Sequence, residues 1–79
     1  MEHEEHVYFV ELAGADARIS LEAQAAQWRT EGVRTTLLRS DDQPELWLLI
    51  GTASSSPPAA ATVDGARTWR FRRPALDEA

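Results

Sequence analysis

The segment Leu46–Thr52 has the sequence LWLLIGT, and the segment His6–Leu12 has the sequence HVYFVEL. Both are rich in aliphatic, β-branched and aromatic residues, which predicts two β-strands. Apolar residues occupy nearly every position, so both faces of each predicted strand are apolar. Strands of this kind need cover on both faces and belong in the interior of a sheet. We therefore place these two segments at the centre of the predicted sheet.

Two more strands are predicted at Val33–Arg39 (VRTTLLR) and Ala66–Arg73 (ARTWRFRR), which together contain six of the eight arginines. Charged strands suit the edges of a sheet, where they discourage pairing between molecules. The order across the sheet is then fourth, first, third and second strand. The polar loop 40–44 is short, so the second and third strands should be antiparallel.

One amphipathic helix is predicted at about Leu21–Glu31, between the first two strands. Its apolar residues recur at i, i+4 and i+7 and are Leu21, Ala25 and Trp28. Asp16 or Ser20 can cap the start. Gly32 suits the left-handed position that ends a helix, and Val33 would then fold back onto the last turn.

The segment Ala53–Ala61 (ASSSPPAAA) forms either a short helix after Ser56 or a linker. The sequence therefore predicts an α+β fold of ferredoxin-like type, with the order β-α-β-β-(short or absent α)-β. Its four-stranded, mainly antiparallel sheet has one main helix on one face. The pattern leaves open which face the helix covers.

Over Val7–Arg73, this order of elements resembles that of small proteins of the dimeric α+β barrel superfamily. The resemblance implies a homodimer. It also implies an alternative function, that of a cofactor-free enzyme of monooxygenase or isomerase type that uses a cavity between two sheets.

The composition indicates a single domain of 79 residues without cysteine or lysine, which excludes disulfides, thiol nucleophiles and Schiff-base chemistry. Five acids near the termini account for the net charge of −5, and they are Glu2, Glu4, Glu5, Asp77 and Glu78. We expect residues 1–5 and 76–79 to be disordered tails. An acidic chain lacks the charge that general nucleic-acid binding needs. No targeting or membrane-spanning segment is visible, so we expect a cytoplasmic protein that binds neither nucleic acid nor membrane.

No cofactor or metal site is expected. His3 and His6 are three residues apart at the start of a strand, whereas zinc-protease signatures place two histidines at i and i+4 on a helix. No nucleophile elbow surrounds the serines at 54–56, and the isolated glycines form no phosphate-binding loop.

The candidates for proton transfer are Glu11, His6 and Tyr8. Glu11 is the one charge inside the first apolar strand, and a position at the rim of the sheet explains it equally well. The candidates for binding an apolar ligand are Trp47, Trp69 and Phe9. These aromatic residues also suit a core or an interface, because each buries a large area.

The leading hypothesis is a small homodimeric, non-catalytic module that binds a small apolar ligand or a protein partner through its sheet face. It follows from central strands that are apolar on both sides while only one helix is available as cover. A second copy related by a two-fold axis is the simplest cover for the other side.

Valine at position 32 should destabilise the protein more than asparagine. A β-branched side chain in the left-handed region costs about 1 kcal/mol or more, whereas asparagine tolerates this backbone conformation. Thermal unfolding of Gly32→Val and Gly32→Asn measures the difference. Equal losses would mean that the helix ends at another residue.

Overall fold

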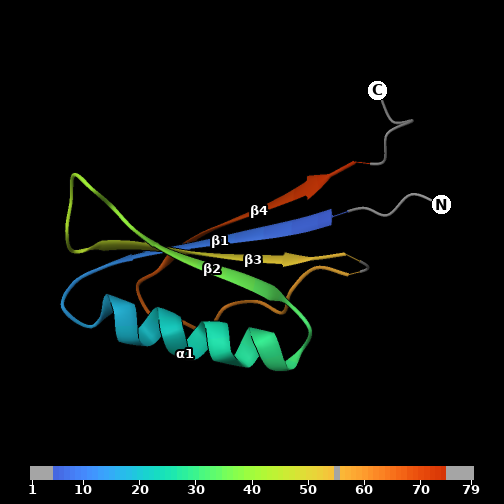
Figure 1. The fold of residues 1–79 in the computed structure, drawn as a ribbon, viewed down its shortest axis with the longest axis horizontal. Coiled ribbons are helices and arrows are strands. Elements are labelled where there is room, and N and C mark those ends of the chain that lie inside the picture. Colours follow the sequence, from blue (N-terminus) through green and yellow to red (C-terminus); the bar gives the residue numbers. More distant parts are fainter. Residues whose placement is uncertain (1–4, 55, 75–79) are drawn as a thin grey trace.

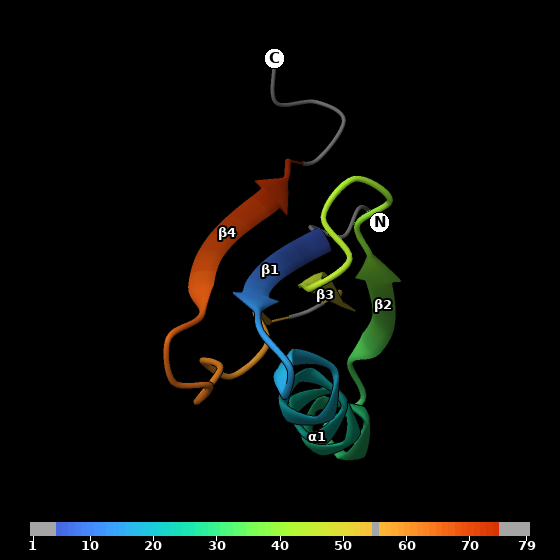
Figure 2. The same ribbon diagram turned by 90° about the vertical axis from the view of Figure 1, so that its left-hand side faces the viewer.

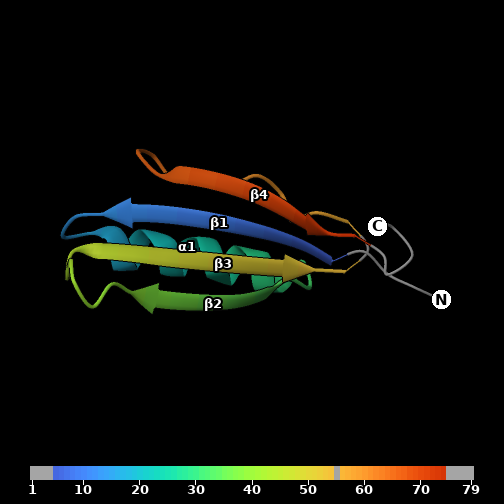
Figure 3. The same ribbon diagram turned by 90° about the horizontal axis from the view of Figure 1, so that it is seen from above.

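The computed structural model describes residues 5–54 and 56–74, which form one four-stranded sheet and one helix (Figure 1). Along the chain, the elements are β1 (Glu5–Ala13), α1 (Ala17–Thr30), β2 (Arg34–Arg39), β3 (Leu46–Ala53) and β4 (Arg67–Arg73). The order across the sheet is β2-β3-β1-β4. The predicted α+β, ferredoxin-like arrangement is confirmed, with the two apolar strands in the centre and the arginine-rich strands at the edges (Figure 3).

Every pair of neighbouring strands is antiparallel. β1 pairs with β3 from His6 opposite Ala53 to Ala13 opposite Leu46, and it pairs with β4 on its other side. β1 starts at Glu5, so the predicted N-terminal tail overlaps the sheet by this residue. The remaining predicted tail residues, 1–4 and 76–79, lie outside the described residues.

The helix begins at Ala17, ahead of the predicted Leu21, because Ala17 is buried and extends the apolar stripe by one more turn. Neither predicted cap acts through its side chain: Asp16 makes no capping hydrogen bond, and Ser20 lies inside the helix. At the other end, Gly32 has the predicted left-handed conformation, with φ of +83°.

The two hydrogen bonds at this end have the pattern of a Schellman motif. The Val33 N–H donates to the Trp28 carbonyl at 3.1 Å, and the Gly32 N–H donates to the Arg29 carbonyl at 3.1 Å. The hydrogen bond from Val33 brings the chain back over the last turn. The predicted helix end is therefore confirmed.

The core lies between α1 and the sheet face that carries Tyr8, Val10 and Leu49. Trp28 is fully buried at its centre and packs on Gly51 of β3. A Cβ atom at position 51 would lie 2.5 Å from Cζ3 of Trp28, which is closer than real side chains approach. Glycine at 51 is therefore what lets the indole lie on the strand.

The segment 56–66 contains no helix; it is an irregular coil on the same side of the sheet as α1, next to β4 (Figure 2). Side chains of the core hold its backbone. The Trp28 indole N–H donates to the Ala59 carbonyl at 2.9 Å, and the Tyr8 hydroxyl accepts a bond from the Ala61 N–H at 3.3 Å. Oε1 of Gln24, which is buried, accepts from the Thr62 N–H at 3.0 Å. The coil thus takes the place of a second helix over this part of the sheet.

Gly51→Ala should lower the free energy of unfolding by about 1–3 kcal/mol, because the added methyl group overpacks the contact with Trp28. The loss should be smaller when the same change is made in a Trp28→Phe background, since phenylalanine lacks the outer ring of the indole. Chemical denaturation of the two single variants and the double variant measures this coupling. If the losses in free energy of unfolding of the two single variants simply add in the double variant, contact with Trp28 is not the reason for glycine at position 51.

Candidate functional site

The sheet face opposite α1, here called the open face, is apolar along its middle. Successive side chains of a strand point to opposite faces, and directly paired residues share a face. Because Val10 and Leu49 face the helix, their sequence neighbours face away from it. The larger apolar residues of the open face are Val7, Phe9, Leu38, Leu46, Leu48, Ile50, Trp69 and Phe71.

Three of these side chains are exposed to a degree that is unusual for large apolar residues. The exposed fractions are 57% for Phe71, 47% for Leu38 and 38% for Trp69. Leu38 lies on β2 and the two aromatic residues on β4, so the exposure extends to both edges of the sheet. The open face is therefore a broad apolar surface.

Aromatic rings gather where β1 meets β4. Phe9 and Phe71 contact each other edge to face, with ring centroids 5.4 Å apart, and Trp69 pairs directly with Phe9 across the two strands. Beside these rings, Val7, Phe9 and Phe71 line a shallow depression of about 370 Å³ together with two arginines. This part of the open face has the shape and the chemistry to contact an apolar group.

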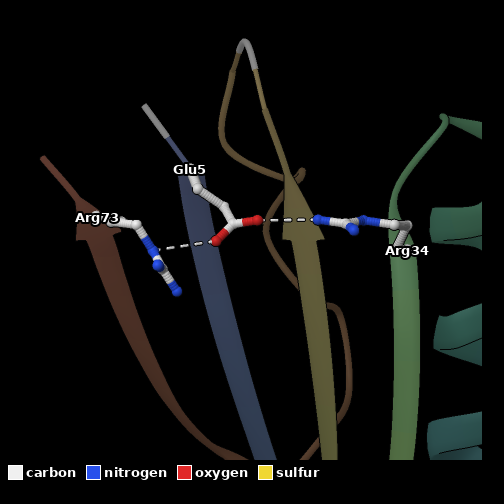
Figure 4. Close-up of polar contacts among 3 residues, drawn as sticks. All are labelled: Glu5, Arg34 and Arg73. Carbon is white, nitrogen blue, oxygen red and sulfur yellow. Dashed lines mark hydrogen bonds and ion pairs between the residues drawn. The ribbon is translucent and has the colours of Figure 1, made fainter. Parts of the chain in front are cut away.

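Ion pairs lie at both ends of the open face. At one end, the Glu5 carboxylate on β1 accepts from the Arg34 guanidinium of β2 at 2.9 Å and contacts Arg73 of β4 at 3.3 Å (Figure 4). The Arg34 side chain reaches over β3 to do so. At the other end, Glu11 lies 3.7 Å from Arg67. Paired charges thus border the apolar surface.

The three candidates for proton transfer are not brought together. Glu11 lies on the open face, whereas His6 and Tyr8 lie on the face that α1 and the coil cover. Tyr8 is buried, its hydroxyl accepts from Ala61, and its ring contacts Trp28 with centroids 5.3 Å apart. The sheet separates the carboxylate from the other two groups, so they form no common site.

The three candidates for ligand binding are also divided. Phe9 and Trp69 are directly paired on the open face. Trp47 lies on the covered face, partly buried against the core, with the Arg39 guanidinium 5.4 Å above its ring. Leu38 was missed by sequence reasoning, because the sequence does not show which face of the sheet the helix covers.

The described residues contain no group of three or more histidine, cysteine, aspartate or glutamate side chains placed to hold a metal ion. His3 lies outside the described residues. Within the same part of the chain, no helix has the length and the apolar character needed to cross a membrane.

No protein-family model, curated protein or solved structure matches the chain. The resemblance to the dimeric α+β barrel superfamily therefore stays a prediction from the order of elements.

Glu5→Gln should lower the free energy of unfolding by at most about 1 kcal/mol, because both of its arginine partners are largely exposed. The loss should vanish in about 1 M salt, where the screening length falls to about 3 Å. Thermal unfolding at low and high salt tests this, with Glu31→Gln, a change at the end of α1, as the control. A loss that persists at high salt would mean that Glu5 acts through packing rather than charge.

Proposed function

We propose that the chain is a non-catalytic binding module that acts as a homodimer, with the open faces of two copies packed against each other. The observation that supports it is the apolar surface of the open face, on which Phe71, Leu38 and Trp69 are exposed. Soluble monomers seldom expose large continuous apolar patches, whereas interfaces use them. A stable interface of ordinary size buries about 800 Å² on each partner.

The charges favour a second copy over a strongly charged partner. The open face carries two carboxylates, Glu5 and Glu11, and each is paired with arginine inside the same chain. Two copies can therefore approach without unpaired charge in the middle of the contact. A two-fold axis makes one apolar patch complementary to itself.

The arginines of β4 also favour contact through the face rather than through the edge. If two β4 strands paired antiparallel about their centre, arginines would lie opposite arginines. Like charges directly opposite each other destabilise a pair of strands. Contact through the open face avoids this repulsion.

A small apolar ligand is the cargo that we propose for this dimer. The aromatic cluster of Phe9, Trp69 and Phe71, with the depression beside it, would lie between the two sheets. Stacked or edge-on rings suit an apolar guest, and the ion pairs at the ends of the face would stay at the rim. The separation of Glu11 from His6 and Tyr8 favours this module over the alternative of a cofactor-free enzyme.

Light scattering at micromolar concentration should give about twice the chain mass of 8.8 kDa. Leu38→Glu and Phe71→Glu should each give a folded monomer, because both positions are exposed within one chain and a charge there would have to be desolvated in the dimer.

Ile19→Glu is the matched control, since Ile19 is 68% exposed on α1, away from the open face. This variant should remain a dimer. A folded wild-type monomer would contradict the homodimer and leave the open face for a protein partner. Dimers in both open-face variants would place the interface elsewhere.

A further inference from the structure

A second concave surface lies on the covered side of the sheet, at the place where β1 and β4 meet the coil. We call it the β1–β4 pocket. Basic side chains, aromatic rings and prolines line it: His6, Tyr8, Pro57, Pro58, Arg70 and Arg72, together with Val7 and Phe71, which also line the open-face depression. Its volume is about 250 Å³. The proposed dimer interface lies on the opposite face of the sheet; its depression shares Val7, Phe71 and Arg72 with the pocket, whereas His6 and Arg70 line the pocket alone.

The strand register brings the basic groups of the pocket together. His6 is paired directly with Arg72, and Tyr8 is paired directly with Arg70. Directly paired side chains of an antiparallel sheet share a face, with Cβ atoms about 4.5–5.5 Å apart. Two guanidinium groups and an imidazole therefore project from one side of β1 and β4. None of the described residues that line the pocket is acidic.

Arg70 is held in place and keeps most of its hydrogen-bonding capacity. Its guanidinium lies over the Tyr8 ring, 5.2 Å from the centroid, and one nitrogen donates to the Pro58 carbonyl at 3.3 Å. A guanidinium has five N–H donors in a fixed planar fork. Among the described residues, Pro58 uses only one of them. The group is thus positioned by its neighbours while its other donors are available to an acceptor.

The His6 side chain is also available to bind an acceptor. It is half-buried, and within the described residues its ring makes no hydrogen bond or ion pair. Arg72 already makes an interaction within the chain, so Arg70 and His6 carry the inference. The two are diagonal neighbours on β1 and β4, a separation that long side chains can span, and each can donate a hydrogen bond.

The size and the walls of the pocket limit the ligand. Pockets for drug-sized ligands measure about 300–1,000 Å³, so a pocket of about 250 Å³ suits a smaller molecule. Pro57 and Pro58 offer apolar contact beside the basic groups. We propose that the β1–β4 pocket binds a small organic carboxylate, with the carboxylate on Arg70 and His6 and an apolar body against Pro57 and Pro58.

The test is a nuclear magnetic resonance titration of the ¹⁵N-labelled protein with benzoate, benzamide and acetate. Benzoate has both the charge and the apolar ring, benzamide keeps the ring without the charge, and acetate keeps the charge without the ring. Benzoate should shift the backbone amides of His6, Tyr8, Arg70 and Arg72 more than those of the open face. It should bind at least about tenfold more tightly than either of the other two compounds, because charge-assisted hydrogen bonds and apolar contact both contribute.

Variants of the pocket identify the groups that hold the anion. Arg70→Gln should weaken benzoate binding by about tenfold or more, since it removes a charged donor. Arg70 also contacts the coil, so His6→Gln is a second variant, with an expected weakening of about threefold or more. Arg18→Gln is the matched control and should leave binding unchanged, because Arg18 pairs with Glu22 on the exposed surface of α1.

Benzoate affinity that is unchanged in both pocket variants would overturn the proposal. So would equal binding of benzamide and benzoate, the largest shifts on the open face, or the absence of shifts up to about 50 mM benzoate. The oligomeric state of the same samples is measured separately. A dimer that does not bind benzoate would contradict the pocket alone, and a monomer that binds benzoate would contradict the homodimer alone.

Discussion

The fold depends on one contact, the Trp28 indole on Gly51. The ring is fully buried between α1 and β3, and its N–H holds the coil through the Ala59 carbonyl. One side chain therefore fixes the distance between helix and sheet and the position of a segment that has no regular structure of its own. A buried indole N–H needs an acceptor, and here a backbone carbonyl of the coil supplies it.

Much of this architecture could be predicted from the sequence, because the deciding residues act locally. Two strands that are apolar on both sides had to be central, and arginine-rich strands had to be at the edges. Gly32 marked the end of the helix because few other residues adopt its backbone conformation. The helix start was placed too late, because alanine at position 17 is too small to signal a buried turn.

The candidate sites were harder to predict, because they depend on which face the helix covers. If the helix covered the other face of the sheet, Leu48 and Val7 would lie under it in place of Trp47 and His6. Local sequence patterns do not distinguish these two arrangements. The coil was also beyond local prediction. Its backbone is held by hydrogen bonds to the side chains of Tyr8, Gln24 and Trp28, which are distant in sequence. The proline and alanine side chains of the coil cannot supply such partners themselves. The two ion pairs of Glu5, with Arg34 and Arg73, likewise could not be predicted, because they depend on β2 and β4 lying on opposite sides of β1 in the folded sheet.

The place of β4 in the sheet has a consequence for how the chain acquires its structure during synthesis. β1 is made before the other described strands, yet one of its two partners is β4, the last strand among the described residues. Until Arg73 is made, β1 is an unprotected edge with free backbone donors and acceptors. Pairing between β1 and β4 also closes a long loop, which slows folding in comparison with local hairpins. The arginines of β4 therefore protect an edge that forms only after β4 is made, and before that point the β1 edge has to avoid aggregation without them.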